Sequence, residues 1–226
     1  MMSCDSCRKR RLPFYNSFTW QDLSCRQKVR ESQLDKIKPY DQPVRLQLDL
    51  VSGSFSPFTE FYERRLSQLA TLFHDQAAVQ HMLAADDPLL FDVRSSPFVT
   101  SLSDFTFVIT RIYPGLVGDE YFMTKGHFHL LLEMPEIYFC LRGQGYLLLE
   151  SAEGDFHAQW LSPGTVSHIP PGYAHRTVNI GREPLIFSAV QHLKAGHDYG
   201  KIAQRGFSRL VIQRNGKPEL VENPRR

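Results

Sequence analysis

Residues 121–143 read YFMTKGHFHLLLEMPEIYFCLRG and hold the first candidate functional motif of this chain. Side chains two positions apart on an extended strand point to the same face, so His127 and His129 share one face while Phe128 points to the other. Glu136 follows after a short loop, and an antiparallel return of the chain can place its carboxylate beside both imidazoles. The stretch therefore predicts three metal ligands on two neighbouring strands.

A second motif, GTVSHIPPGYAHRTVN at residues 164–179, adds a fourth candidate ligand. Its Pro-Gly pair predicts a tight turn, and His175 then begins a strand. Three imidazoles and one carboxylate suit Fe, Mn, Ni or Zn in the divalent state, and coordination positions left for water or substrate would make the site catalytic. His168 also lies in an apolar run, but it is out of phase with the motif, and we expect it to pack or to support a ligand rather than to bind metal.

Around these motifs the chain consists of short apolar or alternating runs separated by Gly and Pro, which is typical of strands. We expect strands at 89–93, 105–113, 121–124, 137–141, 146–150, 158–161, 166–169, 177–179, 185–190 and 209–213. Gly143-Gln144-Gly145 and Asn215-Gly216 supply the turn residues that hairpins need. Many short strands with tight turns predict a mainly β sandwich or small barrel rather than βαβ units.

The region before residue 88 has a different pattern. Apolar residues from Phe61 to Phe73 recur at helical spacing after Pro57, which predicts a helix over 59–73 with Thr59 as its N-cap. A second helix is expected over 76–85, because the residue before Pro88 disfavours the helical conformation. Residues 1–45 are polar and basic, and we expect a partly disordered or peripheral arm there, followed by one domain over 46–226.

Composition limits the classes of partner. The chain has 226 residues, of which 42% are hydrophobic, enough for a real core, and a formal net charge of only +2, which does not favour nucleic acid or a membrane as partner. Cys4 and Cys7 have no second pair at zinc-site spacing, and with Cys25 and Cys140 they are expected to be reduced thiols. The first thirty residues lack the apolar run of a signal peptide, so we expect a cytoplasmic protein.

Together the two motifs resemble the paired motifs of the cupin superfamily, the first with a longer gap before its glutamate. With the flanking stretches YFMTKGHFH, PGYAHRTVNIG and AGHDYG, the chain resembles the cupin-type glucose-6-phosphate isomerase family from about residue 45 to its C-terminus. The resemblance implies a cupin jelly-roll β-barrel from about 88 to 213 with the helical segment outside it. It also implies a homodimer, with a sugar phosphate as substrate.

The resemblance further implies a metal-dependent aldose-ketose isomerase that interconverts glucose 6-phosphate and fructose 6-phosphate, a step of glycolysis and gluconeogenesis. One divalent metal per chain is expected, with Fe²⁺ favoured and Mn²⁺, Ni²⁺ or Zn²⁺ compatible. Its ligands map onto His127, His129, Glu136 and His175. The substrate contacts map onto Thr110, Thr124, Gly126, Tyr138 and His197. Gln191 stands where the family has a substrate-contacting tyrosine, and its amide can still hydrogen-bond a phosphate or hydroxyl.

Moving a proton between C2 and C1 through a cis-enediol requires one base close to both carbons. Glu136 is the candidate base, and His197 can shuttle protons between the oxygens or open the sugar ring. Two alternatives use the same metal cage. One is another cupin enzyme, such as a sugar-phosphate epimerase or an iron dioxygenase. The other is a cupin that binds a sugar phosphate without turning it over.

Overall fold

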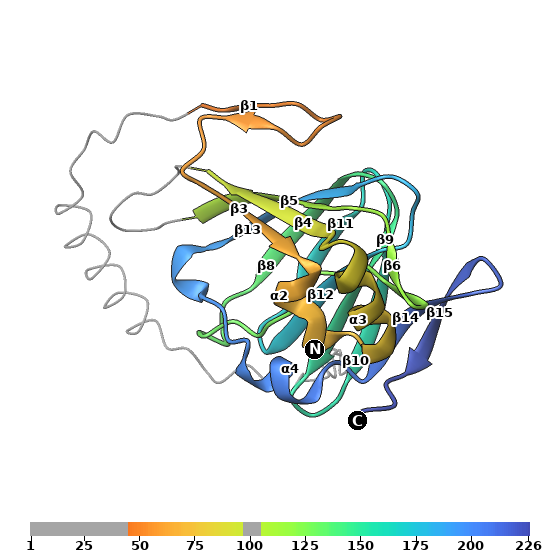
Figure 1. Ribbon diagram of the computed structural model, residues 1–226. Coiled ribbons are helices and arrows are strands. Elements are labelled where there is room, and N and C mark those ends of the chain that lie inside the picture. The colour runs from red at the N-terminus through yellow and green to blue at the C-terminus, as the bar shows by residue number, and fades with distance from the viewer. Residues whose placement is uncertain (1–44, 97–104) are drawn as a thin grey trace, which may run out of the picture. The chain divides into compact units, whose positions relative to one another are not determined.

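The computed structural model describes residues 45–96 and 105–226, and the statements below concern these ranges (Figure 1). The predicted N-terminal arm, apart from its last residue, lies outside the described residues. Cys4, Cys7 and Cys25 lie outside them as well. The predicted division of the chain at residue 45 therefore stays a prediction.

The larger sheet has six antiparallel strands in the order β11-β8-β13-β5-β4-β3. Their bounds are β3 Glu60–Arg65, β4 Leu89–Ser95, β5 Phe105–Ile112, β8 Glu136–Arg142, β11 Val166–Ile169 and β13 Leu185–His192. Side chains of β8 alternate between buried and exposed from Glu136 to Cys140, because successive residues of a strand point to opposite faces. Glu136 and Tyr138 consequently share the buried face.

The second sheet has the order β10-β9-β12, with bounds β9 Gly145–Ser151, β10 Phe156–Leu161 and β12 Tyr173–Asn179. Single bridges from Met123 to Val178 and from His127 to His175 place the segment 123–127 beside β12. From β8 to β13 the chain passes repeatedly between the two sheets, which is the crossing pattern of a jelly roll. The predicted fold class, a mainly β jelly roll with a flanking helical segment, is confirmed.

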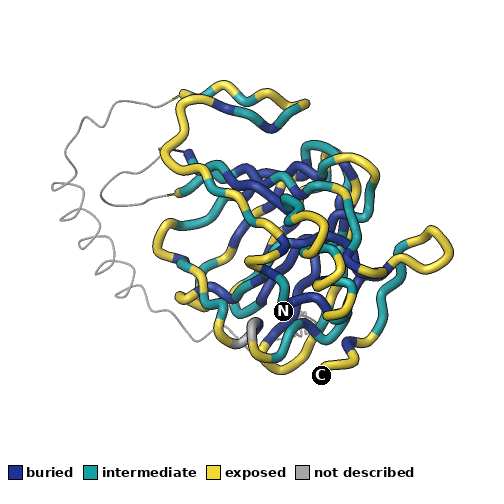
Figure 2. The backbone as a smooth tube through the Cα atoms, viewed as in Figure 1, coloured by how far each residue is buried: buried dark blue, intermediate teal, exposed yellow. Residues whose placement is uncertain are grey.

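The core lies between the two sheets. Buried side chains of both belong to one apolar cluster, which includes Tyr138 and Phe187 of the larger sheet and Leu147 and Leu149 of the smaller one. Figure 2 shows this buried interior in dark blue along the central strands. Close packing of this kind holds the facing strands at fixed positions, and it therefore fixes the side chains that line the interior.

The predicted helix over 59–73 is wrong in its first half. Residues 60–65 form β3, and only α2 Leu66–Leu69 and the 3₁₀ helix η1 Ala70–Leu72 are helical. Tyr62 pairs with Val93 in the ladder between β3 and β4, and the Thr59 amide donates to the Ser95 carbonyl instead of the residue capping a helix. Tertiary pairing thus outweighs a local pattern that fits a helix.

The second predicted helix is confirmed with the predicted bounds, α3 Gln76–Ala85. The carboxylate of Asp75 caps it by accepting from the Ala78 amide at 2.9 Å. The helix ends before Asp86, whose backbone is extended, and the restriction that Pro88 places on Asp87 keeps the helix from continuing.

The remaining elements are short. A four-stranded sheet has the order β15-β14-β7-β6, and the predicted Asn215-Gly216 turn joins its hairpin β14–β15. Of the predicted strand 121–124, only Tyr121 lies in β7, and Met123 forms one bridge. The other bounds are β1 Gln47–Leu48, β2 Phe55–Ser56, β6 Leu116–Val117, β7 Glu120–Tyr121, β14 Arg209–Arg214, β15 Lys217–Glu222, η2 Leu193–Ala195 and α4 Gly200–Arg205. Within the described ranges, every helix is too short or too polar to cross a membrane.

Candidate active site

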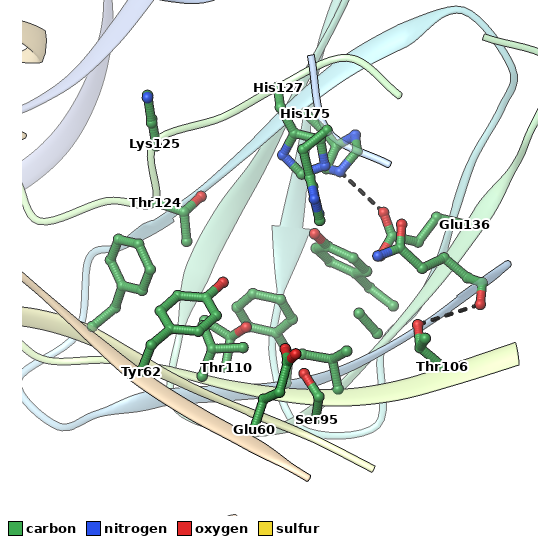
Figure 3. Close-up of a pocket in the computed structure, with 18 of the residues that line it drawn as sticks. Glu60, Tyr62, Ser95, Thr106, Thr110, Thr124, Lys125, His127, Glu136 and His175 are labelled. Atoms are coloured by element: carbon green, nitrogen blue, oxygen red, sulfur yellow. Dashed lines mark hydrogen bonds and ion pairs between the residues drawn. The ribbon is translucent and has the colours of Figure 1, made fainter. Parts of the chain in front are cut away.

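Four side chains, those of His127, His129, Glu136 and His175, come together inside the barrel. The backbones of His127 and His175 face each other in an antiparallel pair, joined by hydrogen bonds of 3.3 and 3.0 Å. Side chains of directly opposed residues lie on the same face, so both imidazoles enter the interior. Glu136 reaches them from β8 of the other sheet (Figure 3).

The potential ligand atoms of these four side chains all lie within 4.8 Å of one another. Oε2 of Glu136 lies 3.2 Å from Nε2 of His129 and 3.0 Å from Nε2 of His175. Glu136 is 3% exposed and His175 is 2% exposed. The structure therefore brings the predicted ligand set together at a site that is largely excluded from solvent.

The hydrogen bonding of the imidazoles fits a divalent cation. Nδ1 of His129 lies 2.7 Å from the Met134 carbonyl, which fixes a proton on Nδ1 and leaves Nε2 to act as a ligand. Among the described residues, Nε2 of His127 and Nε2 of His175 are buried without a well-formed hydrogen bond, although the latter is close to Glu136. Buried polar atoms normally have a partner, so these two nitrogens are available to bind a metal ion.

The charges of the cluster also favour a cation. Burial by itself raises the pKa of Glu136, but the contacts with His129 and His175 outweigh it and hold this pKa at about 2. Burial and the neighbouring histidines lower the pKa of His127 well below its usual value. At neutral pH the site thus offers an anionic carboxylate and a neutral imidazole, the forms that bind metal.

A cavity of about 380 Å³ opens onto this cluster. Every residue that was predicted to contact substrate lines it: Thr110, Thr124, Gly126, Tyr138, Gln191 and His197. His127, Glu136 and His175 line the same cavity, which is large enough for a small organic molecule. The structure therefore places three of the four predicted metal ligands and all the predicted substrate contacts around one space, and the fourth ligand, His129, lies beside Glu136.

Several of these residues present hydrogen-bond donors. Oγ1 of Thr124 accepts from the Thr177 amide at 3.0 Å, which leaves its own proton available to the cavity. Burial, followed by the nearby Glu136, raises the pKa of Tyr138 well above 10, so that its hydroxyl remains a donor. Gln191 is the cross-strand partner of Glu136, and its buried Oε1 has no hydrogen-bond partner in the described parts of the chain.

His197 lies at the edge of the cluster. Its ring centroid is 4.2 Å from that of His127 and 5.7 Å from that of Tyr199, on which it stacks. Burial lowers the pKa of His197, and the repulsion from His175 and His129 adds to this effect while Glu136 opposes it. A neutral imidazole can accept a proton on one nitrogen and donate from the other.

Glu60 and Tyr62 are among the cavity residues that the sequence did not reveal, because they lie where a helix was predicted. Both belong to β3, and Figure 3 shows their polar ends at the cavity. Their spacing of two residues is a strand signal that the helical pattern concealed. His168 is exposed on β11 and does not line the cavity, so its predicted packing or supporting role is wrong.

Comparisons with known proteins agree with this geometry. The model of the glucose-6-phosphate isomerase (GPI) family matches residues 63–225. Glucose-6-phosphate isomerase of Pyrococcus furiosus is 44% identical over 188 residues, which cover 82% of this chain and 98% of that protein. The protein of the same name from Sinorhizobium medicae is 38% identical over 177 residues, which cover 78% and 83%.

Among solved structures, oxalate decarboxylase from Bacillus subtilis aligns with a TM-score of 0.38 and 20% identity, over 49% of this chain and 26% of that one. The family model, by contrast, spans the four predicted metal ligands and most of the cavity lining, although Thr59, Glu60 and Tyr62 precede it. This chain belongs to the glucose-6-phosphate isomerase family.

Proposed function

We propose that this protein is a metal-dependent aldose-ketose isomerase that interconverts glucose 6-phosphate and fructose 6-phosphate through a cis-enediol. One observation carries the proposal: four potential metal ligands converge at the wall of a cavity that neutral hydrogen-bond donors also line. A hexose phosphate needs both features, because its carbonyl end reacts while its phosphate end binds.

His127, His129, Glu136 and His175 would hold one divalent cation. When bound, it supplies Lewis-acid stabilisation of negative charge on the sugar oxygens. Fe²⁺ is the favoured ion, and Mn²⁺, Ni²⁺ and Zn²⁺ remain compatible because they accept the same nitrogen and oxygen ligands.

Thr110, Thr124 and Gly126 would bind the phosphate. Hydroxyl and amide protons hydrogen-bond an anion without adding a charge of their own, and a glycine lets the anion approach the backbone. Tyr138 and Gln191 lie nearer to Glu136 along the sheet, where their polar ends would orient the sugar hydroxyls.

Glu136 would move the proton between C2 and C1. Its low pKa keeps it ionised at neutral pH, as a base must be, but the histidine contacts that lower this pKa also weaken the base. Full basicity therefore requires these contacts to loosen during the reaction. His197, neutral and beside His127, would transfer protons between the sugar oxygens.

Turnover of fructose 6-phosphate, measured before chelation and after each metal is restored in turn, tests the proposal. We expect turnover to disappear on chelation and to return with at least one divalent ion. Full turnover by metal-free protein would contradict the metal dependence. Oxygen consumption would instead indicate a dioxygenase, and sugar-phosphate binding without exchange of the C2 proton would indicate a binding protein.

A matched pair of histidine variants serves as control. His129→Ala removes a proposed ligand, whereas His168→Ala removes an exposed imidazole on β11, outside the cavity. Only the first should lose bound metal. The homodimer that the family resemblance implies stays a prediction.

A further inference from the structure

The segment Thr124–His127 is fixed to β12 at both of its ends but not in the middle. The Thr124 amide donates to the Thr177 carbonyl at 2.9 Å, and the His127 amide donates to the His175 carbonyl at 3.3 Å. Between them, the peptide that joins Lys125 to Gly126 makes no backbone hydrogen bond with another part of the described chain. Something other than the strand ladder must fix the orientation of this peptide.

Arg176 makes that contact. Its Nη2 donates to the Lys125 carbonyl at 2.8 Å, and its guanidinium lies over the Phe207 ring at 4.7 Å from the centroid. The side chain is on the face of β12 opposite to His175, because neighbouring residues of a strand point to opposite faces, and it does not line the cavity. Arg176 is only 2% exposed, and its Nε has no partner among the described residues.

The hydrogen bond determines where the Gly126 amide points. In a trans peptide the carbonyl and the following N–H point in opposite directions, so a Lys125 carbonyl directed at Arg176 turns the Gly126 N–H toward the cavity. Gly126 is buried and lines the cavity, and in the described residues no acceptor binds its amide. Because buried N–H groups are normally paired, this amide is available to donate a hydrogen bond to a bound ligand.

Gly126 also rests directly on the arginine. Its φ is +75°, and a Cβ at this position would lie 2.7 Å from a ring carbon of Phe207 and 3.2 Å from both Cβ and Nε of Arg176. A larger residue would therefore collide with Phe207 and Arg176, so only glycine fits between these side chains and a ligand in the cavity. Arg176 and Phe207 therefore support the peptide between Lys125 and Gly126 on the side that faces away from the cavity.

We propose that Arg176 is a positioning residue, which fixes the peptide between Lys125 and Gly126 so that the Gly126 amide donates to the phosphate of the substrate. Its guanidinium also directs positive charge to this end of the cavity from behind the peptide. The proposal rests on the proposed function and extends it, since it assigns a role in phosphate recognition to an arginine outside the cavity lining.

The test compares Arg176→Met with Arg225→Met, both in the zinc-loaded full chain. Arg225 is the matched control because it also donates to backbone carbonyls, those of Thr71 and Leu72, and it lies outside the cavity lining. The probes are glucitol 6-phosphate, which cannot isomerise, and glucitol, which lacks the phosphate. Calorimetry gives their affinities, and the NMR spectrum of ¹⁵N-glycine-labelled protein follows the Gly126 amide.

In the parent chain, glucitol 6-phosphate should shift the Gly126 amide downfield. Arg176→Met should bind it roughly tenfold more weakly or worse, lose this shift and bind glucitol as the parent does. The KM for fructose 6-phosphate should rise with a smaller change in kcat, and Arg225→Met should match the parent in each measurement. Arg176→Gln, whose shorter side chain does not reach the Lys125 carbonyl, should behave like Arg176→Met.

Two results would overturn the inference. One is a folded Arg176→Met or Arg176→Gln variant that keeps both the parental affinity and the Gly126 shift. The other, which needs no variant, is a parental Gly126 amide that does not respond to glucitol 6-phosphate. A parent that shows this response but does not turn over fructose 6-phosphate would instead refute the proposed function and leave the positioning role of Arg176 intact.

Discussion

Glu136 combines two proposed roles in one carboxylate. It begins β8, it is almost completely buried, and it contacts His129 and His175 through the same oxygen, Oε2. Since Oε2 contacts the two imidazoles, Oε1 is the oxygen that would act as the base. The two roles make different demands, because a metal ligand needs only an oxygen lone pair whereas a base also needs a proton affinity.

Glu136→Gln separates these demands. The amide keeps the shape and an oxygen, so metal affinity should fall moderately, while isomerisation should fall by about two to four orders of magnitude because the base is lost. His129→Ala deletes a ligand and should instead lose the metal. Fructose 6-phosphate turnover and C2 proton exchange would be measured in both variants at saturating metal. Near-normal exchange in fully metallated Glu136→Gln would show that the base lies elsewhere, with His197 the next candidate.

At the scale of elements, the corner between β8 and β9 connects the two sheets of the barrel. Gly143 has φ +82°, and a Cβ there would lie 2.7 Å from the Pro184 carbonyl oxygen and 2.8 Å from Cα of Leu185. The corner thus packs against the start of β13, the strand that neighbours β8. A change at this corner acts on the strand that carries Glu136 and Tyr138.

Gly143→Ala should therefore destabilise the protein more than Gly164→Ala. Gly164 has a similar φ of +90° but open space around it, so an alanine there has only the backbone cost, about 1 kcal/mol. At Gly143 the added methyl group would also meet backbone atoms of Pro184 and Leu185, which cannot move away easily, so the loss of unfolding free energy should reach about 3 kcal/mol. Urea unfolding of both variants measures the difference. Equal losses would mean that the corner relaxes around the added methyl group.

At the scale of the whole molecule, the C-terminal residues tie distant elements together. Glu150 of β9 is fully buried, and its carboxylate accepts from the Ser208 amide at 2.7 Å and pairs with Arg226. The neighbouring Arg225 donates to the carbonyls of Thr71 and Leu72. The last residues of the chain therefore link β9, the central strand of its sheet, to the helical segment that precedes the barrel.

Arg226→Ala should lower the free energy of unfolding by about 2 kcal/mol, because it leaves the buried Glu150 carboxylate with weaker compensation. Arg214→Ala removes a comparable but exposed ion pair with Glu219 and should cost no more than about 0.5 kcal/mol. Denaturant unfolding provides the comparison, and Glu150→Gln should recover part of the loss in the Arg226→Ala background. If Arg226→Ala proves as stable as Arg214→Ala, Arg205, whose Nη2 lies 3.8 Å from Glu150, already balances the charge.

The sequence by itself determined the features that depend on neighbouring residues. The alternation of His127 and His129 follows from the two-residue period of an extended chain. The end of α3 follows from Pro88, which stands three residues beyond it. Short apolar runs between glycines and prolines predicted most strands of both sheets, because burial of one face imposes its period on the sequence.

The tertiary structure decided what depends on residues far apart in the chain. Residues 60–65 became a strand because β4 offered a ladder of backbone hydrogen bonds, and a periodicity count along one segment contains no information about that partner. Likewise, no spacing placed Arg176 beneath the peptide between Lys125 and Gly126, 51 residues away. Ligand types can be recognised from a local pattern, but the groups that orient them are chosen by packing, which only the folded chain defines.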